Sequence, residues 1–204
     1  MITGASRGIG LALVKWFSAH YHKVWALSRN TTPITQLNLP NVTVNALDLT
    51  NEDAVVSWAQ NEAPDTIDAL INNAGKLVNK PFAETTQSDF EGVFKVNVFG
   101  LANLTRALLK KLQPTGHVVN ISSMGGIGGT SKFPGLAAYS SSKGAVSILT
   151  ELLAEELKET GPSVNALALG AVQTEMLSDA FPGLEVPMTA AMMADYIAQF
   201  ALDG

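Results

Sequence analysis

Thr3-Gly4-Ala5-Ser6-Arg7-Gly8-Ile9-Gly10 is the stretch that decides the fold, because it places three glycines at the start of a segment of helical period, Ile9–His20. Glycine tolerates positive φ and lets the backbone come close to a ligand. The start of a helix presents unpaired N–H groups and a partial positive charge, which together suit a pyrophosphate. The stretch therefore predicts a phosphate cradle, with a flexible terminal turn as the alternative.

Short apolar runs alternate with longer segments of helical period along the rest of the chain. This alternation is typical of a parallel sheet covered by helices. We therefore expect residues 1–204 to form one α/β domain, a doubly wound parallel sheet in three α/β/α layers. The expected strands are Lys23–Leu27, Val42–Leu47, Ile67–Ile71, His117–Ile121 and Val164–Leu169. The expected helices are Ile9–His20, Asn51–Asn61, Gln87–Leu112, Ala138–Thr160 and Ala190–Leu202.

Both ends of the predicted sheet are short for such a fold. A strand of about five or six residues should precede the first helix, yet only Met1–Thr3 stand before Gly4. At the other end the chain stops at Gly204, directly after a helix, where a further parallel strand would be expected. The first and last strands are therefore expected to be truncated.

Two of the expected helix starts carry a capping signal. Thr50 with Asp53, and Thr86 with Asp89, have the spacing in which a hydroxyl and a carboxylate satisfy free amides. Both pairs are therefore predicted to cap the helices that follow them.

The composition excludes several classes of protein. Hydrophobic residues make up 47% and charged residues 15%, which excludes a disordered chain, and no apolar run is long enough to span a membrane. The first ten residues lack the hydrophobic segment of a secretory signal, so a cytoplasmic protein is expected. The absence of cysteine and the spacing of the three histidines predict no metal site. A net charge of -5 argues against a nucleic-acid partner held by a broad positive face.

The end of the second expected strand indicates which dinucleotide is bound. In folds that bind NAD, an acid about 20 residues past the glycines usually binds the ribose 2′-hydroxyl. Here Val24–Asn30 contains no acid, but it contains Arg29, and Arg7 lies within the glycine turn. A guanidinium is suited to pairing with a phosphate. The sequence therefore favours NADP(H) over NAD(H), the alternative being that both arginines are merely solvated.

Tyr139 is the one tyrosine with a lysine four residues later, Lys143. On a helix this spacing places the two side chains on one face. A phenol with a pKa near 10 is a poor base at neutral pH, but a neighbouring ammonium lowers that pKa. Tyr139 is therefore predicted to exchange a proton with a carbonyl oxygen or an alcohol, with its pKa lowered by Lys143.

Several ordered motifs give the chain a resemblance to the short-chain dehydrogenase/reductase family over essentially all of its length except the two ends. The motifs are Thr3-Gly4-x3-Gly8-x-Gly10, Asp48-Leu49, Asn72-Asn73-Ala74-Gly75, Asn97 within Lys95–Val98, Ser122-Ser123 and Tyr139-x3-Lys143. The resemblance implies a Rossmann fold. It also implies an NADP-dependent oxidoreductase that transfers a hydride between the nicotinamide and a carbonyl or secondary alcohol of a small, apolar substrate.

The resemblance further implies four catalytic residues. Tyr139 is expected to act as the acid and base, while Lys143 lowers its pKa and binds the nicotinamide ribose. Ser123 is expected to hydrogen-bond the reacting oxygen, with Ser122 as the weaker candidate. Asn97 is expected to hold a water that connects Lys143 to solvent, the alternative being a plain surface asparagine.

The cofactor contacts also follow from the resemblance. Asp48 and Leu49 are expected beside the adenine, and Asn73–Gly75 along the cofactor ribose. After the sixth strand the family usually has Pro-Gly and then a threonine that helps to orient the nicotinamide amide; Leu169 replaces the proline, which loosens the backbone there. The expected cofactor-binding residues are Gly4, Ser6, Arg7, Gly8, Ile9, Gly10, Arg29, Asp48, Leu49, Asn73, Ala74, Gly75, Tyr139, Lys143, Gly170, Val172 and Thr174.

Two stretches are expected to face the nicotinamide, Met124–Ala138 and Glu175–Met188. Both are rich in Gly, Met, Phe, Leu and Pro, as expected of a loop and a lid that exclude water around an apolar substrate, and the lid is expected at about residues 170–188. Ordinary packing of loops on the core would explain the same residues. No Lys or Arg follows Lys158, which weakens the alternative of a 3-oxoacyl-acyl-carrier-protein reductase, although Lys132 could meet the acidic carrier.

Broad apolar faces on two helices predict self-association. The helices Gln87–Leu112 and Ala138–Thr160 are apolar on more than one face, as helices buried between subunits often are. The resemblance implies a homodimer or homotetramer built on them, with a small-molecule substrate and no membrane partner. Two functions of other classes are left as alternatives. One is a non-catalytic sensor that binds NADP, and the other is a methyltransferase, which would explain neither Arg29 nor the tyrosine–lysine pair.

Overall fold

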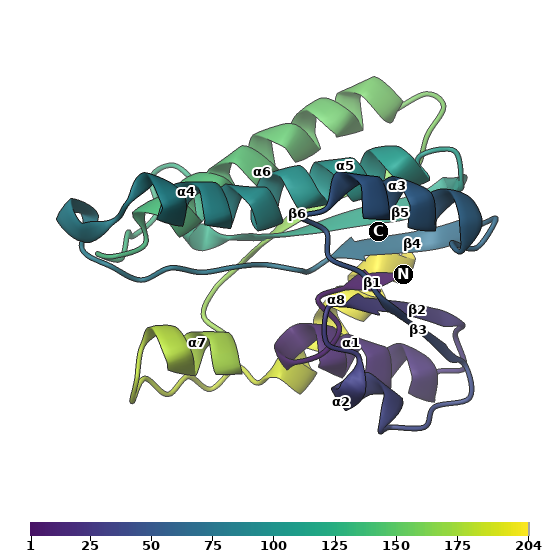
Figure 1. The fold of residues 1–204 in the computed structure, drawn as a ribbon, viewed down its shortest axis with the longest axis horizontal. Coiled ribbons are helices and arrows are strands. Elements are labelled where there is room, and N and C mark those ends of the chain that lie inside the picture. Colours follow the sequence, from purple (N-terminus) through teal and green to yellow (C-terminus); the bar gives the residue numbers. More distant parts are fainter. Residues whose placement is uncertain (204) are drawn as a thin grey trace.

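A six-stranded parallel sheet runs through the centre of the computed structural model, which describes residues 1–203 (Figure 1). The strand order is β3-β2-β1-β4-β5-β6, so the direction of winding reverses between β1 and β4. A crevice at the carboxyl ends of the strands, at such a reversal, is where open α/β sheets bind ligands. The strands are β1 (Ile2–Thr3), β2 (Val24–Ser28), β3 (Val42–Ala46), β4 (Ile67–Asn72), β5 (Leu112–Ser123) and β6 (Ser163–Leu169).

Helices cover both faces of the sheet and bury two apolar cores (Figure 1). On one face α1 packs against α8, and the core includes Leu13, Ile71 and Ile197. On the other face lie α3 to α6, and the core includes Leu70 and Leu104. The helices are α1 (Gly8–Ala19), α2 (Thr32–Thr35), α3 (Glu52–Asn61), α4 (Gln87–Phe94), α5 (Leu101–Leu108), α6 (Ala137–Leu157), α7 (Glu175–Ala180) and α8 (Ala190–Asp203).

These layers confirm the predicted α/β/α architecture with its doubly wound sheet. Each of the five expected strands is present, and β1 is two residues long, pairing with β2 on one side and β4 on the other. Strands buried on both faces need near-continuous apolar runs, which is why the sequence pattern located them well. β5 starts earlier than expected, at Leu112, so the preceding helix ends at Leu108.

The long helix expected over Gln87–Leu112 is wrong as one element. The chain forms α4, then a π-helical segment η2 (Lys95–Gly100), and then α5. In η2, Asn97 is buried, and a Cβ on Gly100 would lie 3.0 Å from the Cβ of Leu49. Hydrophobic periodicity does not reveal such a change in backbone hydrogen bonding. The 3-10 turns η1 (Phe82–Glu84) and η3 (Met124–Gly126), like α2 and α7, are too short to show a period.

The two predicted caps had different outcomes. Thr86 and Asp89 form the expected capping box at the start of α4. The cap of α3 is instead Asn51, whose side chain accepts from the N–H of Ala54. Thr50 is occupied elsewhere, since its N–H and hydroxyl donate to the Asp48 carboxylate at 2.9 and 2.8 Å. The Asp48 carboxylate, just after β3, therefore takes the hydrogen bonds of Thr50 that would otherwise be available at the start of α3.

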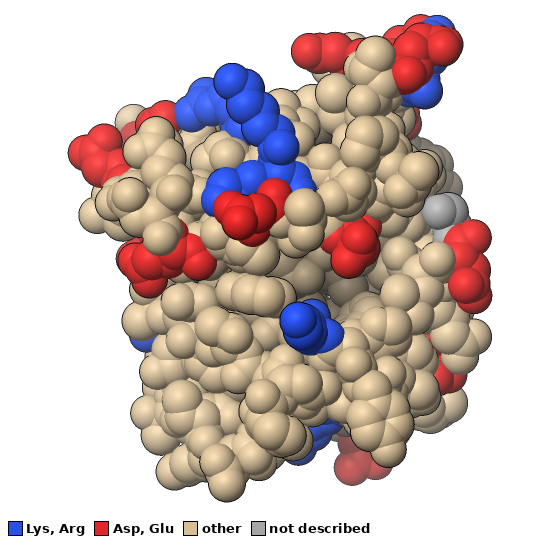
Figure 2. All heavy atoms as spheres, turned by 90° about the vertical axis from the view of Figure 1, so that its right-hand side faces the viewer, with Lys and Arg blue, Asp and Glu red and all other residues tan. Residues whose placement is uncertain are grey.

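The side of the molecule on which the strands begin is shown in Figure 2. On this side most Lys and Arg side chains lie near Asp or Glu side chains, and larger uncharged areas lie between these small groups. No helix within residues 1–203 is both long enough and apolar enough to cross a bilayer.

Candidate functional site

A cavity of about 370 Å³ opens at the carboxyl ends of the strands, where β1 and β4 are neighbours. Its lining brings together residues from the glycine turn, the ends of β2 to β6, α6 and α7. Of the residues predicted for the site, Gly10 and Asn97 do not line this cavity, and all the others do.

The glycine turn has the backbone that the sequence predicts. Gly4 and Gly8 have φ of +65° and +52°, the left-handed region that favours glycine. Arg7 is the N-cap of α1 but makes no side-chain capping bond, and the first turn of α1 contains no acidic residue. The N–H groups at this helix start are therefore available to an anion, which the helix dipole also favours.

Gly10 allows close packing rather than ligand contact. A Cβ at this position would lie 2.6 Å from Asn73 Nδ2 and 2.8 Å from the carbonyl carbon of Gly4. The first turn of α1 therefore rests directly on the glycine turn, and only a hydrogen fits between them.

Asn73 fastens the ends of β1 and β4 together. Its amide donates to the carbonyls of Thr3 at 3.0 Å and Gly4 at 3.3 Å, and the Thr3 hydroxyl accepts from the N–H of Asn73 and of Ala74. Asn73 lines the cavity, but its side-chain amide donates to the protein's own backbone. This clamp fixes the turn relative to the sheet.

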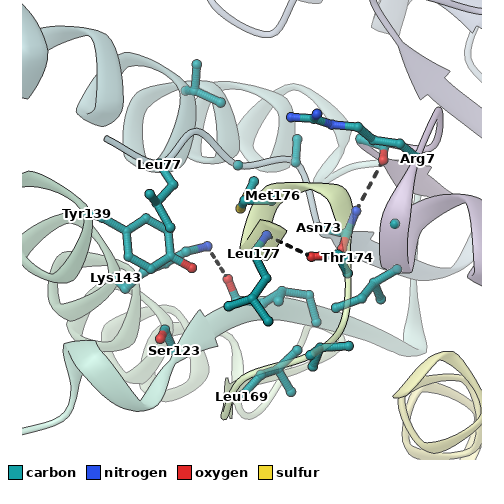
Figure 3. A pocket seen from close by; sticks show the side chains of 18 of the residues that line it. Arg7, Asn73, Leu77, Ser123, Tyr139, Lys143, Leu169, Thr174, Met176 and Leu177 are labelled. Carbon is teal, nitrogen blue, oxygen red and sulfur yellow. Dashed lines mark hydrogen bonds between the residues drawn. The ribbon is translucent and has the colours of Figure 1, made fainter. Parts of the chain in front are cut away.

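Tyr139 and Lys143 lie on one face of α6 and line the same cavity (Figure 3). Lys143 Nζ is 5.7 Å from the centroid of the Tyr139 ring and donates to the Ile121 carbonyl at 2.6 Å. Ser123, at the end of β5, lines the same cavity on the side of Tyr139 (Figure 3). Ser122 points the other way, since its buried hydroxyl donates to the Lys143 carbonyl at 2.9 Å. Three of the four predicted catalytic residues therefore meet at one end of the cavity.

The pKa of Tyr139 differs from the sequence expectation. Burial raises the pKa of the phenol above its usual value, and the hydrogen bond from Ser123 opposes this only in part. Burial also lowers the pKa of Lys143 to about 8. The lower pKa expected for Tyr139 rested on the attraction between phenolate and ammonium, but burial also removes hydration, which acts on both groups. Burial therefore favours the protonated form of this phenol.

The buried ammonium of Lys143 gives a testable pH dependence of stability. Between about pH 8 and pH 10 the unfolded chain binds more protons at this residue than the folded protein does, so the free energy of unfolding rises with pH. Below about pH 8 both states are protonated and the full cost of burial remains, roughly 3 kcal/mol for a displacement of this size. Lys143→Met should remove this rise.

Urea unfolding between about pH 7 and pH 10 measures the effect. Lys158→Met is the matched control, because this lysine lies at the exposed end of α6. A Lys143→Met protein whose stability climbs as steeply as that of the unmodified protein would contradict the assignment.

Asn97 lies in η2 and is 1% exposed, so it is not a surface asparagine. Its Oδ1 accepts from the Lys76 N–H at 2.7 Å, and its amide donates to the Lys76 carbonyl and to the Ser142 hydroxyl at 3.0 and 2.8 Å. The Ser142 hydroxyl in turn donates to the Tyr139 carbonyl at 2.7 Å. This chain of bonds joins the loop after β4 to the helix that carries Tyr139.

Ser142 is the residue that the sequence argument missed. It is fully buried in α6, between the two residues that the argument singled out. Its position three residues after Tyr139, on the same helix face, was the available signal.

The segment after β6 lies against the glycine turn. Thr174 caps α7 by accepting from the Leu177 N–H, and its methyl group would lie 3.3 Å from a Cβ on Gly8. Arg7 forms an exposed ion pair with Asp179 of α7 at 3.5 Å. Figure 3 shows Leu177, and Met176 behind it, projecting into the cavity. The region predicted as a lid therefore contains a short helix that lies over the site.

Charges surround the end of the cavity near β2 and β3. The hydrogen bonds from Thr50 hold the pKa of Asp48 below its usual value, and the nearby Arg29 and Lys95 lower it further. A second cavity of about 530 Å³ adjoins this end and is lined by Arg7, Arg29 and Lys95 among others. Within residues 1–203 no group of three His, Cys, Asp or Glu is placed to hold a metal ion.

Comparisons of sequence and of structure with known proteins point to the same family. A family model described as short chain dehydrogenase matches residues 1–185. Carbonyl reductase [NADPH] 2 of Sus scrofa is 34% identical, over 86% of this chain and 72% of its own length. A short-chain dehydrogenase from Streptomyces avermitilis has a similar structure, with a TM-score of 0.85 and 30% identity over 100% of this chain and 83% of that one. A 3-ketoacyl-(acyl-carrier-protein) reductase from Brucella melitensis, complexed with NADH, gives a TM-score of 0.86 at 25% identity, over 98% and 88% of the two chains.

Proposed function

Because the chain belongs to the short-chain dehydrogenase/reductase family, we propose that it is an NADP(H)-dependent enzyme that interconverts a carbonyl group and a secondary alcohol on a small, apolar substrate. The family's members are oxidoreductases that act on such groups with a nicotinamide cofactor. The observation that carries the proposal is the meeting of Tyr139, Lys143 and Ser123 at one end of a cavity whose other end is the glycine turn.

The residues present fit a dinucleotide. The uncapped start of α1 and the left-handed glycines suit the pyrophosphate. Asp48 and Leu49 would flank the adenine, while Lys143 would bind the nicotinamide ribose. Gly170, Val172 and Thr174 line the cavity after β6 and would contact the nicotinamide.

The chemistry of the protein side chains follows from their geometry. When bound, the nicotinamide supplies or accepts the hydride. Tyr139, held protonated by burial, would donate its proton to the carbonyl oxygen, while the Ser123 hydroxyl would hydrogen-bond the same oxygen. In the opposite direction the phenolate would accept the proton of the alcohol, and the Lys143 ammonium would stabilise that phenolate.

Asn97 would support a proton relay through a water. A Cβ on Gly75 would lie 3.7 Å from Asn97 Oδ1 and 3.9 Å from Lys143 Nζ, so the glycine leaves a gap beside both polar atoms. A water in that gap would connect Lys143 towards solvent. The hydrogen bonds of Asn97 to Lys76 and Ser142 would hold this arrangement in place.

Arg29 provides the test of cofactor preference. We expect Arg29→Asp to lower the ratio of kcat/KM for NADPH over NADH about a hundredfold, because a charge-assisted contact to the 2′-phosphate is replaced by repulsion. Initial rates with both cofactors measure this ratio. Arg106→Asp is the control, since this arginine lies on α5, pairs with Glu52 at the surface and lines neither cavity. An unchanged ratio in Arg29→Asp would remove the basis for NADP(H).

Residues 170–188 would act as a lid on this site. Met176 and Leu177 of α7 already project into the cavity, and the Arg7–Asp179 ion pair joins α7 to the glycine turn. Movement of this segment would admit the cofactor and the substrate and then exclude water.

A homodimer or homotetramer would cover the apolar side chains left on the outer helix faces. Phe99 of η2 and Ile148 and Leu152 of α6 are 56%, 58% and 64% exposed, and removing their apolar surface from water would favour association. Light scattering on the purified protein distinguishes the two assemblies.

A further inference from the structure

Charged residues are unevenly distributed along the main cavity. Its charged lining residues are Arg7, Arg29, Asp48, Lys143 and Glu175. All except Lys143 belong to the glycine-turn end, since Glu175 lies against Gly8 and the other three stand in the turn or after β2 and β3. Among the residues that the structure describes, Lys143 is therefore the one charged lining residue at the end of the cavity beside Tyr139.

Apolar side chains form the wall at that end. Phe133 comes from the segment between η3 and α6, and Phe181 directly follows α7, yet their ring centroids are 6.4 Å apart with the planes at 63°. Phe133 is 63% exposed, although it lines the cavity. Met124, Leu136, Leu177 and Leu184 are further apolar residues that line the cavity.

One segment holds the backbone around both rings. The Asn79 side-chain amide donates to the Ala180 carbonyl at 2.7 Å, and the Lys80 N–H donates to the Gly135 carbonyl at 3.0 Å. Ala180 immediately precedes Phe181, and Gly135 is two residues after Phe133. The two rings therefore lie edge to face beside each other, and the two chain segments that carry them, distant in sequence, are both tied to Asn79 and Lys80.

We propose that Phe133 and Phe181 form an aromatic gate that selects neutral ketones, and the corresponding secondary alcohols, with an aromatic or alicyclic ring beside the reacting carbon. The inference rests on the proposed function. A ring can pack against the edge of one phenylalanine and the face of the other, a contact that a linear chain does not reproduce. A charged substituent would lose its hydration without gaining a partner.

The selectivity is measured with three neutral ketones of equal carbon count and a fourth ketone that carries a charge. Acetophenone and cyclohexyl methyl ketone carry a ring, 2-octanone is linear, and 4-acetylbenzoate adds a carboxylate to the first. For the unmodified enzyme with NADPH, kcat/KM should be at least about tenfold higher for the two ring ketones than for 4-acetylbenzoate, and also higher than for 2-octanone.

Leucine substitutions keep the wall apolar while removing the rings. Phe133→Leu and Phe181→Leu should each lower kcat/KM for the ring ketones roughly three- to tenfold, and change it for 2-octanone less than about twofold. Phe82→Leu is the matched control, because Phe82 is 73% exposed on η1 and does not line the cavity. Circular dichroism and NADPH titration verify that each variant is folded and binds cofactor.

The outcomes separate the gate from the proposed function. Turnover with an unchanged ratio of ring to linear ketone in both gate variants would overturn the gate alone, as would efficient reduction of 4-acetylbenzoate. A folded enzyme that binds NADPH but reduces none of these ketones would overturn the proposed reaction on neutral ketones and the gate with it.

Discussion

Tyr139→Phe should lower kcat/KM for carbonyl reduction at least about a thousandfold, while the Kd for NADPH changes less than about threefold. The substitution removes only the hydroxyl, so the ring, its place on α6 and its distance from Lys143 stay the same. What is lost is the proton donor that the structure holds protonated beside Ser123. Steady-state rates with a ketone that the unmodified enzyme reduces give kcat/KM, and fluorescence titration with NADPH gives the Kd.

The chain supplies its own controls for this substitution. Tyr21 and Tyr196 are 93% and 56% exposed and lie outside the cavity, so the same change there should leave kcat/KM within about twofold. A Tyr139→Phe enzyme with most of its activity would exclude this phenol as the acid. An unmodified protein that binds NADPH but turns over no carbonyl or alcohol would instead favour the non-catalytic sensor.

The features that depend on local backbone chemistry were predictable from the sequence. The glycine turn was located because positive φ and close approach require glycine at Gly4 and Gly8, and spacing along a helix brought Tyr139 and Lys143 together. The buried strands were found for the same kind of reason, since a parallel sheet needs apolar runs.

The features that depend on three-dimensional surroundings could not be predicted from the sequence. The pKa of Tyr139 depends on how much water the folded protein excludes, which no pair of residues in a sequence reports. The π-helical turn at Asn97 depends on contacts to Lys76 and Ser142 from two other parts of the chain. Thr50 fails to cap α3 because Asp48 happens to lie within reach of it.

Gly10→Ala should destabilise the protein by about 2 to 3 kcal/mol and abolish measurable NADPH binding. Helix propensity alone predicts the opposite sign for stability, because alanine is favoured over glycine inside a helix by about 1 kcal/mol. Packing outweighs propensity here, since the new methyl group would overlap the Gly4 carbonyl and the Asn73 amide, both of which fix the phosphate cradle.

Gly128→Ala is the matched control for this substitution, because a Cβ there meets no atom within 4 Å. It should leave stability within about 0.5 kcal/mol and cofactor affinity unchanged. Urea unfolding and NADPH fluorescence titration measure both variants under the same conditions. A Gly10→Ala protein that is as stable as the unmodified one and still binds NADPH would show that α1 can move away from the turn without cost. The position of α1 would then not be what holds the cradle in shape.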